Sequence, residues 1–119
     1  MSDVPVLDSA VVSGLRELTP PGEPDVLADV LNIFLVEVPL RMDRLRNAWA
    51  AGNIEEVHRF AHSLRGSAGN IGARRLYEVC RQLEAQGTSG ALAGSALVDA
   101  LGVEFGKVEV EIRRLLNNS

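Results

Sequence analysis

The amino-acid sequence predicts an all-α protein, folded as an antiparallel four-helix bundle with a short additional N-terminal helix. Apolar residues recur at spacings of three and four along most of the chain, which is the period of an amphipathic helix. Short segments that contain Gly, Pro or Asn separate these stretches, and no run alternates between apolar and polar residues as a half-buried strand does. A chain of 119 residues favours one domain over residues 1–119.

The first predicted helix covers residues 6–18, with Asp8 at its N-cap, and residues 19–22 end it. The second covers residues 24–51 and keeps a period of about 3.6 residues although it contains Pro39. Because proline removes the backbone hydrogen bond to the carbonyl of Leu35, we expect a kink there or two abutting segments. The core positions predicted on these two helices are Leu7, Val11, Leu15, Leu18, Leu27, Leu31, Phe34, Val38, Leu45 and Trp49.

The third predicted helix begins after Asn53, a good N-cap residue, and ends near Asn70, because Gly72 suits the left-handed conformation that closes a helix. The fourth follows at once over residues 73–86 and ends at residues 87–90. Residues up to 94 form a loop or a frayed turn, and the last helix covers residues 95–116. The core positions predicted on these helices are Ile54, Val57, Phe60, Ala61, Leu64, Ala68, Ile71, Leu76, Val79, Cys80, Leu83, Leu97, Leu101, Phe105, Val108, Ile112 and Leu115.

Composition and charge argue against several classes of function. Hydrophobic residues make up 46% and charged residues 24% of the chain, which are ordinary values for a globular protein. A net charge of -4 with no run of Lys or Arg argues against a nucleic-acid partner. No segment approaches the about 20 apolar residues of a membrane span, and the first residues lack a signal-peptide pattern, so we expect a cytoplasmic protein with no membrane partner. The single cysteine, Cys80, fits a reducing compartment and a packing role.

His62 lies on the water-facing side of the third predicted helix. At about 100° per residue the apolar residues of that helix fill one stripe, and His62 falls about 150° from its centre. Arg65 and Gly66 follow at three and four residues, so they lie beside the imidazole. Neutral imidazole is a nucleophile near pH 7, and a fixed cation beside it would stabilise a transferred phosphoryl group. Gly66 and Gly69 each cost a helix about 1 kcal/mol and would leave a bare surface for a partner.

These residues resemble the histidine-containing phosphotransfer (HPt) domain of multistep phosphorelays. The resemblance is carried by residues 62–73, HSLRGSAGNIGA, and by Leu76, Cys80 and Leu83-Glu84 after them, and it extends over residues 7–18 and 34–53. It implies that His62 is phosphorylated, accepting a phosphoryl group from an aspartate of a receiver domain and passing it to another receiver. It also implies a carrier that is not a kinase and has no cofactor of its own, with magnesium bound to the partner receiver.

The resemblance also assigns roles to single residues. His62 matches the active histidine and Gly66 the glycine four residues later, whereas Arg65 stands where most members have a lysine, which keeps the charge. Glu84 matches a position where some members have a glutamine that hydrogen-bonds the imidazole, although Gln82 is close enough to compete for that assignment. The residues expected to contact a docked partner are Arg59, Ser63 and Gly69.

Two other interpretations stay open at this point. As an interaction module, the bundle would bind and block a receiver or a kinase without any phosphate on His62. As a small metal-dependent hydrolase, it would use His58 and His62, whose spacing of four can chelate a metal. Arg59, however, stands where a zinc protease of this pattern has its glutamate, and no third ligand follows. We therefore expect no metal site and a structural or exposed His58. We also expect the protein to be a monomer.

Overall fold

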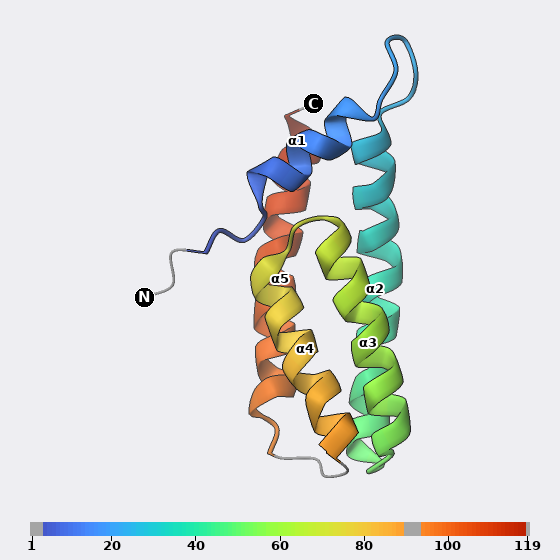
Figure 1. The fold of residues 1–119 in the computed structure, drawn as a ribbon, viewed down its shortest axis with the longest axis vertical. Helices are drawn as coiled ribbons and strands as arrows, with labels where there is room; N and C mark the ends of the chain where they lie inside the picture. Colours follow the sequence, from blue (N-terminus) through green and yellow to red (C-terminus); the bar gives the residue numbers. More distant parts are fainter. Residues whose placement is uncertain (1–3, 90–93, 119) are drawn as a thin grey trace.

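The computed structural model describes residues 4–89 and 94–118, and within these ranges every regular element is a helix. Four helices run side by side along the long axis, and the short α1 crosses one end of them (Figure 1). This arrangement confirms the predicted all-α bundle with an extra N-terminal helix. None of these helices combines the length and the apolar character that crossing a membrane requires. The five helices are α1 (Ser9–Glu17), α2 (Val26–Ala50), α3 (Ile54–Asn70), α4 (Arg74–Ser89) and α5 (Ala96–Asn117).

Short polar side chains begin the first three helices. Asp8, Asp25 and Asn53 each accept a hydrogen bond from a backbone N–H two or three residues further on, at 2.9, 3.0 and 3.2 Å. These bonds satisfy donors that have no partner within the first turn of a helix. The caps predicted at Asp8 and Asn53 are therefore confirmed.

The α2 helix is continuous through Pro39, so the alternative of two abutting segments is wrong. One missing backbone hydrogen bond does not divide the helix, because buried residues on both sides of the proline hold its turns against the bundle. Phe34 and Val38 come before Pro39 and Met42 comes after it, and each of these three side chains is at most 5% exposed.

The α4 helix extends to Ser89, three residues beyond its predicted end at Gln86. Gly87 therefore lies inside the helix and does not terminate it. Glycine costs a helix about 1 kcal/mol relative to alanine, which weakens a helix without forbidding it. Most of the loop predicted up to Gly94 falls on residues 90–93, which lie outside the described residues.

One apolar stripe from each helix forms the core, in which the rings of Phe34 and Phe105 stack with centroids 6.1 Å apart. Leu18 is a wrong prediction, because it is 63% exposed, and Trp49 is only half-buried. Leu18 is the C-cap of α1, so it lies beyond the residues of that helix that pack on the bundle. At the end of α2, Ala48 and not Trp49 occupies the buried position. Other predicted core residues at the edges of the stripes are half-buried: Leu7, Val11, Leu15, Ile54, Phe60, Val79, Leu97 and Leu115. Core residues not predicted are Val12, Met42, Ala48 and Ala73.

The turn between α3 and α4 fastens α1 to the bundle. Gly72 has φ +75 and accepts a hydrogen bond of 2.8 Å from the backbone N–H of Asp8. A Cβ atom on Gly72 would lie 2.9 Å from the Cβ of Val11 and 3.0 Å from the Cβ of Asp8. The turn thus requires glycine twice, for the left-handed backbone and for the close approach of α1.

We predict that Gly72→Ala destabilises the protein by about 3 kcal/mol, because the new Cβ adds a clash to an unfavourable φ. Gly52→Ala is the matched control, since Gly52 also has a positive φ, +69, but open space around its Cβ position. It should cost only about 1 kcal/mol. Urea unfolding followed by circular dichroism measures both values, and equal losses would show that α1 does not constrain the turn.

Candidate functional site

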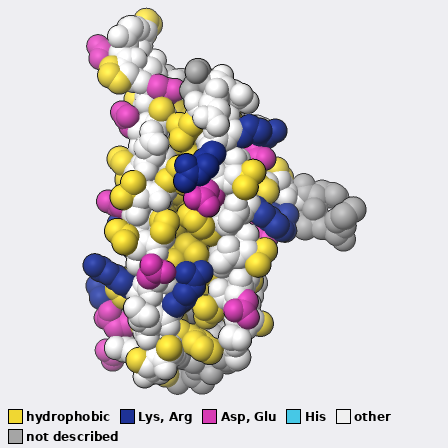
Figure 2. Space-filling view, turned by 180° about the vertical axis from the view of Figure 1, so that it is seen from behind, with side chains coloured by type: hydrophobic (Ala, Val, Ile, Leu, Met, Phe, Trp, Pro, Cys, Tyr) yellow, Lys and Arg dark blue, Asp and Glu magenta, His cyan; other side chains and the backbone are white. Residues whose placement is uncertain are grey.

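His62 occupies the middle of α3 and points out of the bundle. Its side chain is 63% exposed, whereas Ala61 and Leu64 on either side of it are at most 2% exposed. The buried residues of α3 therefore pack against the rest of the bundle, and the imidazole of His62 is exposed to solvent. Seen from behind (Figure 2), the molecule displays hydrophobic, basic and acidic side chains and no histidine.

Glu84 of α4 holds the imidazole from the side. Its Oε2 lies 2.5 Å from Nδ1 of His62, and its own side chain is only 15% exposed. A charged carboxylate can only accept a hydrogen bond, so Nδ1 carries the proton and donates it. The lone pair is then left on Nε2, on the other side of the ring. Gln82, the competing residue, is exposed and donates to Glu78 at 3.3 Å instead.

His58 is tied to the same residue of α4 through the backbone. Its Nδ1 donates a hydrogen bond of 3.1 Å to the carbonyl oxygen of Glu84, and its side chain is half-buried. This bond gives His58 a structural role in joining α3 to α4. Among the residues that the structure describes, no three His, Cys, Asp or Glu side chains gather in a way that could hold a metal ion. The hydrolase interpretation therefore has no ligand set there.

Arg65 lies between His62 and α4, with its side chain 30% exposed. Its Nε is 2.8 Å from Oε1 of Glu84, and its NH2 nitrogen is 3.3 Å from Nδ1 of His62. The NH1 nitrogen donates a hydrogen bond of 3.3 Å to the hydroxyl of Tyr77. The predicted cation is thus beside the imidazole, and it shares its carboxylate with His62.

The two glycines near His62 differ in what surrounds them. A Cβ atom on Gly66 would meet nothing within 4 Å, so the surface one turn after His62 is open. A Cβ atom on Gly69 would lie 3.5 Å from the ring of Tyr77, at ordinary contact distance. The bare surface expected at both glycines is present at Gly66, whereas the ring of Tyr77 lies over Gly69.

Arg59 and Ser63, the other residues expected to meet a partner, lie one turn before and directly after His62. Arg59 is exposed and pairs with Glu56 at 2.5 Å, while its guanidinium lies 4.6 Å from the centroid of the Phe60 ring. The hydrogen bond from Arg59 lowers the pKa of the Glu56 carboxyl. Ser63 is half-buried. The charge of Arg59 is therefore balanced by its own helix.

Tyr77 is the member of the site that sequence analysis missed. It lies seven residues before Glu84, which is two turns of helix, so both side chains emerge from the same face of α4. The spacing of seven residues between Glu84 and Tyr77, the only tyrosine of the chain, could have indicated that Tyr77 lies near the site. Whether this face of α4 turned toward Arg65 depended on the packing of the two helices.

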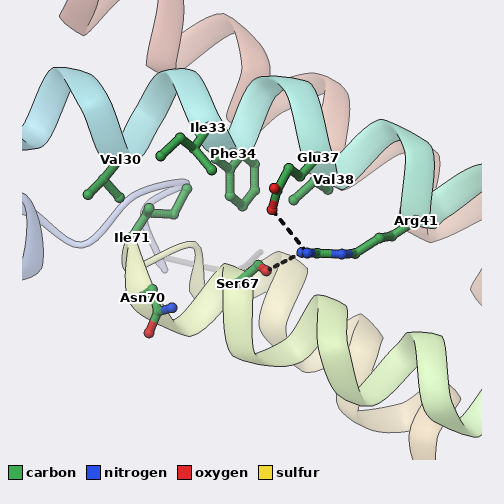
Figure 3. A pocket seen from close by; sticks show the side chains of 9 residues that line it. All are labelled: Val30, Ile33, Phe34, Glu37, Val38, Arg41, Ser67, Asn70 and Ile71. Atoms are coloured by element: carbon green, nitrogen blue, oxygen red, sulfur yellow. Dashed lines mark hydrogen bonds and ion pairs between the residues drawn. The ribbon is translucent and has the colours of Figure 1, made fainter.

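A groove lies along the neighbouring edge of α3, where it meets α2 (Figure 3). Its volume is about 340 Å³. Arg41 reaches across it, donating at 3.3 Å to the hydroxyl of Ser67 and pairing with Glu37 at 3.0 Å. Ile33 of α2 also lines the groove, and Val36 and Leu40 lie on the same helix outside it; each of the three is more than half exposed. The remaining side chains that line the groove are Val30, Phe34, Val38, Asn70 and Ile71.

Comparison with known proteins identifies the family. The family model of the Hpt domain matches residues 29–118, so the chain belongs to the Hpt domain family. The crystal structure of histidine-containing phosphotransfer protein B (HptB) from Pseudomonas aeruginosa PAO1 is similar, with a TM-score of 0.89 and 27% sequence identity. That match covers 98% of this chain and 99% of the other. A comparison with curated protein sequences gives no match.

The family and the fold together define the class of protein. The chain is a histidine phosphotransfer domain of two-component phosphorelays, a helical bundle that carries phosphoryl groups. The resemblance stated from the sequence is thereby confirmed.

Cys80, one turn before Glu84, is fully buried, and burial raises the pKa of its thiol to about 12. Because the thiolate is the reactive form, we predict that iodoacetamide leaves Cys80 unmodified in the folded protein at about pH 8 and alkylates it after denaturation. Mass spectrometry measures the modification. In Ala85→Cys the added thiol occupies an exposed position and should react in the folded state. Rapid alkylation of native Cys80 would contradict its packing role.

Proposed function

We propose that His62 is the residue that carries the phosphoryl group, on Nε2, and that the group comes from and returns to aspartates of receiver domains. The observation that supports this proposal is the exposed imidazole whose Nδ1 is held by Glu84 at 2.5 Å. A ring that donates through Nδ1 presents a lone pair on Nε2, which is the nucleophile the reaction needs.

The transfer is a displacement at phosphorus. The lone pair of Nε2 attacks the phosphorus of the aspartyl phosphate, the bond from phosphorus to the aspartate oxygen breaks, and the aspartate leaves as a carboxylate. The imidazole keeps its Nδ1 proton and becomes positively charged, and the carboxylate of Glu84 stabilises that charge. Arg65 stabilises the negative charge on the transferring group. The return transfer reverses these steps.

The docking surface centres on Gly66, where the open space beside His62 admits the receiver's aspartate. Ser63 and Arg59 would border it on α3, and Gly69 would border it through the ring of Tyr77. The exposed apolar side chains of α2, Ile33, Val36 and Leu40, extend the surface that a receiver could cover. The partner supplies the magnesium ion, so the carrier needs no cofactor.

We infer further that the chain acts as a carrier and not as a kinase, in the cytoplasm and as a monomer, without a nucleic-acid or membrane partner. The net charge of -4 supports the absence of nucleic acid. The single cysteine, buried and free, supports a reducing compartment.

We predict that a phosphorylated receiver labels the wild-type protein and leaves His62→Gln unlabelled. Glutamine keeps the length and polarity of the side chain but has no nucleophilic nitrogen. Gel analysis after mixing with a receiver that carries radioactive phosphate measures the transfer. His58→Gln is the control, because it changes the neighbouring histidine and should still be labelled. Equal labelling of wild type and His62→Gln would refute the assignment, and binding without any labelling would favour an interaction module.

We predict that Gly66→Gln slows transfer from the receiver by at least about tenfold, because the added side chain fills the surface that the receiver needs. Gly106→Gln is the matched control. Gly106 also lies inside a helix with open space around its Cβ position, but on α5. Both changes remove a helical glycine, so neither should destabilise the fold. Single-turnover transfer rates measure the effect, and unchanged transfer in Gly66→Gln would place the docking surface elsewhere.

A further inference from the structure

The three nitrogens of the Arg65 guanidinium have three different neighbours. Nε faces a carboxylate oxygen of Glu84 at 2.8 Å, NH1 faces the hydroxyl of Tyr77 at 3.3 Å, and NH2 faces Nδ1 of His62 at 3.3 Å. The guanidinium is planar and its N–H bonds point in fixed directions. Which contacts hold it therefore decides where its remaining N–H bonds point.

Two of these contacts do not fix the rotation of the group. Nδ1 of His62 already donates to Glu84, so it cannot also accept from NH2. The Nε atom is buried and close to Glu84, but its N–H is not aligned on a carboxylate oxygen, so this contact is an ion pair without hydrogen-bond geometry. Both NH1 and NH2 have hydrogen-bond geometry toward their neighbours, but because Nδ1 of His62 does not accept, the bond from NH1 to the hydroxyl of Tyr77 is the one that fixes the rotation.

Tyr77 is itself held firmly. Its ring is half-buried, packs against the hydrophobic core, and lies beside Gly69, 3.5 Å from where a Cβ atom would be. The centre of the guanidinium lies 5.8 Å from the centroid of the ring, so the aromatic face also attracts the cation. The position of the hydroxyl is thus set by packing and not by Arg65.

We propose that Tyr77 is a positioning residue for phosphoryl transfer, acting through Arg65. Its hydroxyl holds NH1 while Glu84 attracts Nε, and NH2 is left beside the imidazole with N–H bonds to give to the oxygens of the phosphoryl group. The inference rests on the proposed role of His62. It also gives a physical reason for arginine at position 65, because a guanidinium spreads its N–H groups over three nitrogens in fixed directions, whereas a lysine donates all of its N–H bonds from one nitrogen.

The test is a double-mutant cycle of Tyr77→Phe with Arg65→Lys, measured as single-turnover transfer from a phosphorylated receiver. Phenylalanine keeps the packed ring and removes only the hydroxyl. In the wild-type background we expect Tyr77→Phe to slow the maximal rate by about three- to tenfold, with little change in the receiver concentration needed for half-saturation. In the Arg65→Lys background, Tyr77→Phe should change the rate by less than about twofold.

A purely structural role of Tyr77 would slow transfer equally in both backgrounds, and that result, or an unchanged rate in the wild-type background, would overturn the proposal. Failure of the wild-type protein to accept any phosphate would instead refute the proposed function. A second measurement is independent of transfer: in ¹⁵N NMR spectra, Tyr77→Phe should release rotation of the Arg65 guanidinium and leave the His62 tautomer unchanged. A guanidinium that is equally mobile in both proteins would also overturn the proposal.

Discussion

The site depends on one residue of α4, Glu84, which three side chains of α3 contact. His58 donates to its carbonyl oxygen, His62 to one carboxylate oxygen, and Arg65 pairs with the other. These three residues follow one another at spacings of four and three, so they share one face of α3. Glu84 therefore joins the two helices at this face, in the rotation that their packing sets, and fixes the tautomer of the imidazole. The charges of Glu84 and Arg65 balance each other, so on the proposed mechanism His62 is the group of this cluster that changes charge during transfer.

The same interaction explains how a carboxylate tolerates a position that is only 15% exposed. A charge withdrawn from water is unfavourable unless hydrogen bonds and an opposite charge replace the lost solvation. Here the imidazole and the guanidinium replace it, and the buried Cys80 and Leu83 lie beneath on the same helix. Because the core below is closely packed, the carboxylate cannot retreat into it. The imidazole of His62 is thus held on one side by Glu84 and stays open to solvent on the other.

Periodicity predicted much of this arrangement, since the apolar stripe of a single helix already places His62 in solvent and Asn53 at a helix start. It could not decide how far α4 turns about its axis relative to α3. That rotation separates Glu84, which reaches the imidazole, from Gln82, which does not, and it brings Tyr77 over Gly69. The failures within single helices have a similar origin. The α2 helix runs through Pro39 because tertiary packing outweighs one lost backbone bond.

On the proposed mechanism, the two charged partners of His62 act in opposite directions. The carboxylate of Glu84 stabilises the positive imidazole that forms when Nε2 attacks, but it repels the phosphoryl group that arrives. Arg65 attracts that group, yet part of its charge is already engaged by Glu84 at 2.8 Å. A lone arginine would bind the phosphoryl group more tightly and make its departure slower. A carrier must release what it accepts, and an arginine shared with a carboxylate, its orientation set by Tyr77, supports the transfer without trapping its product.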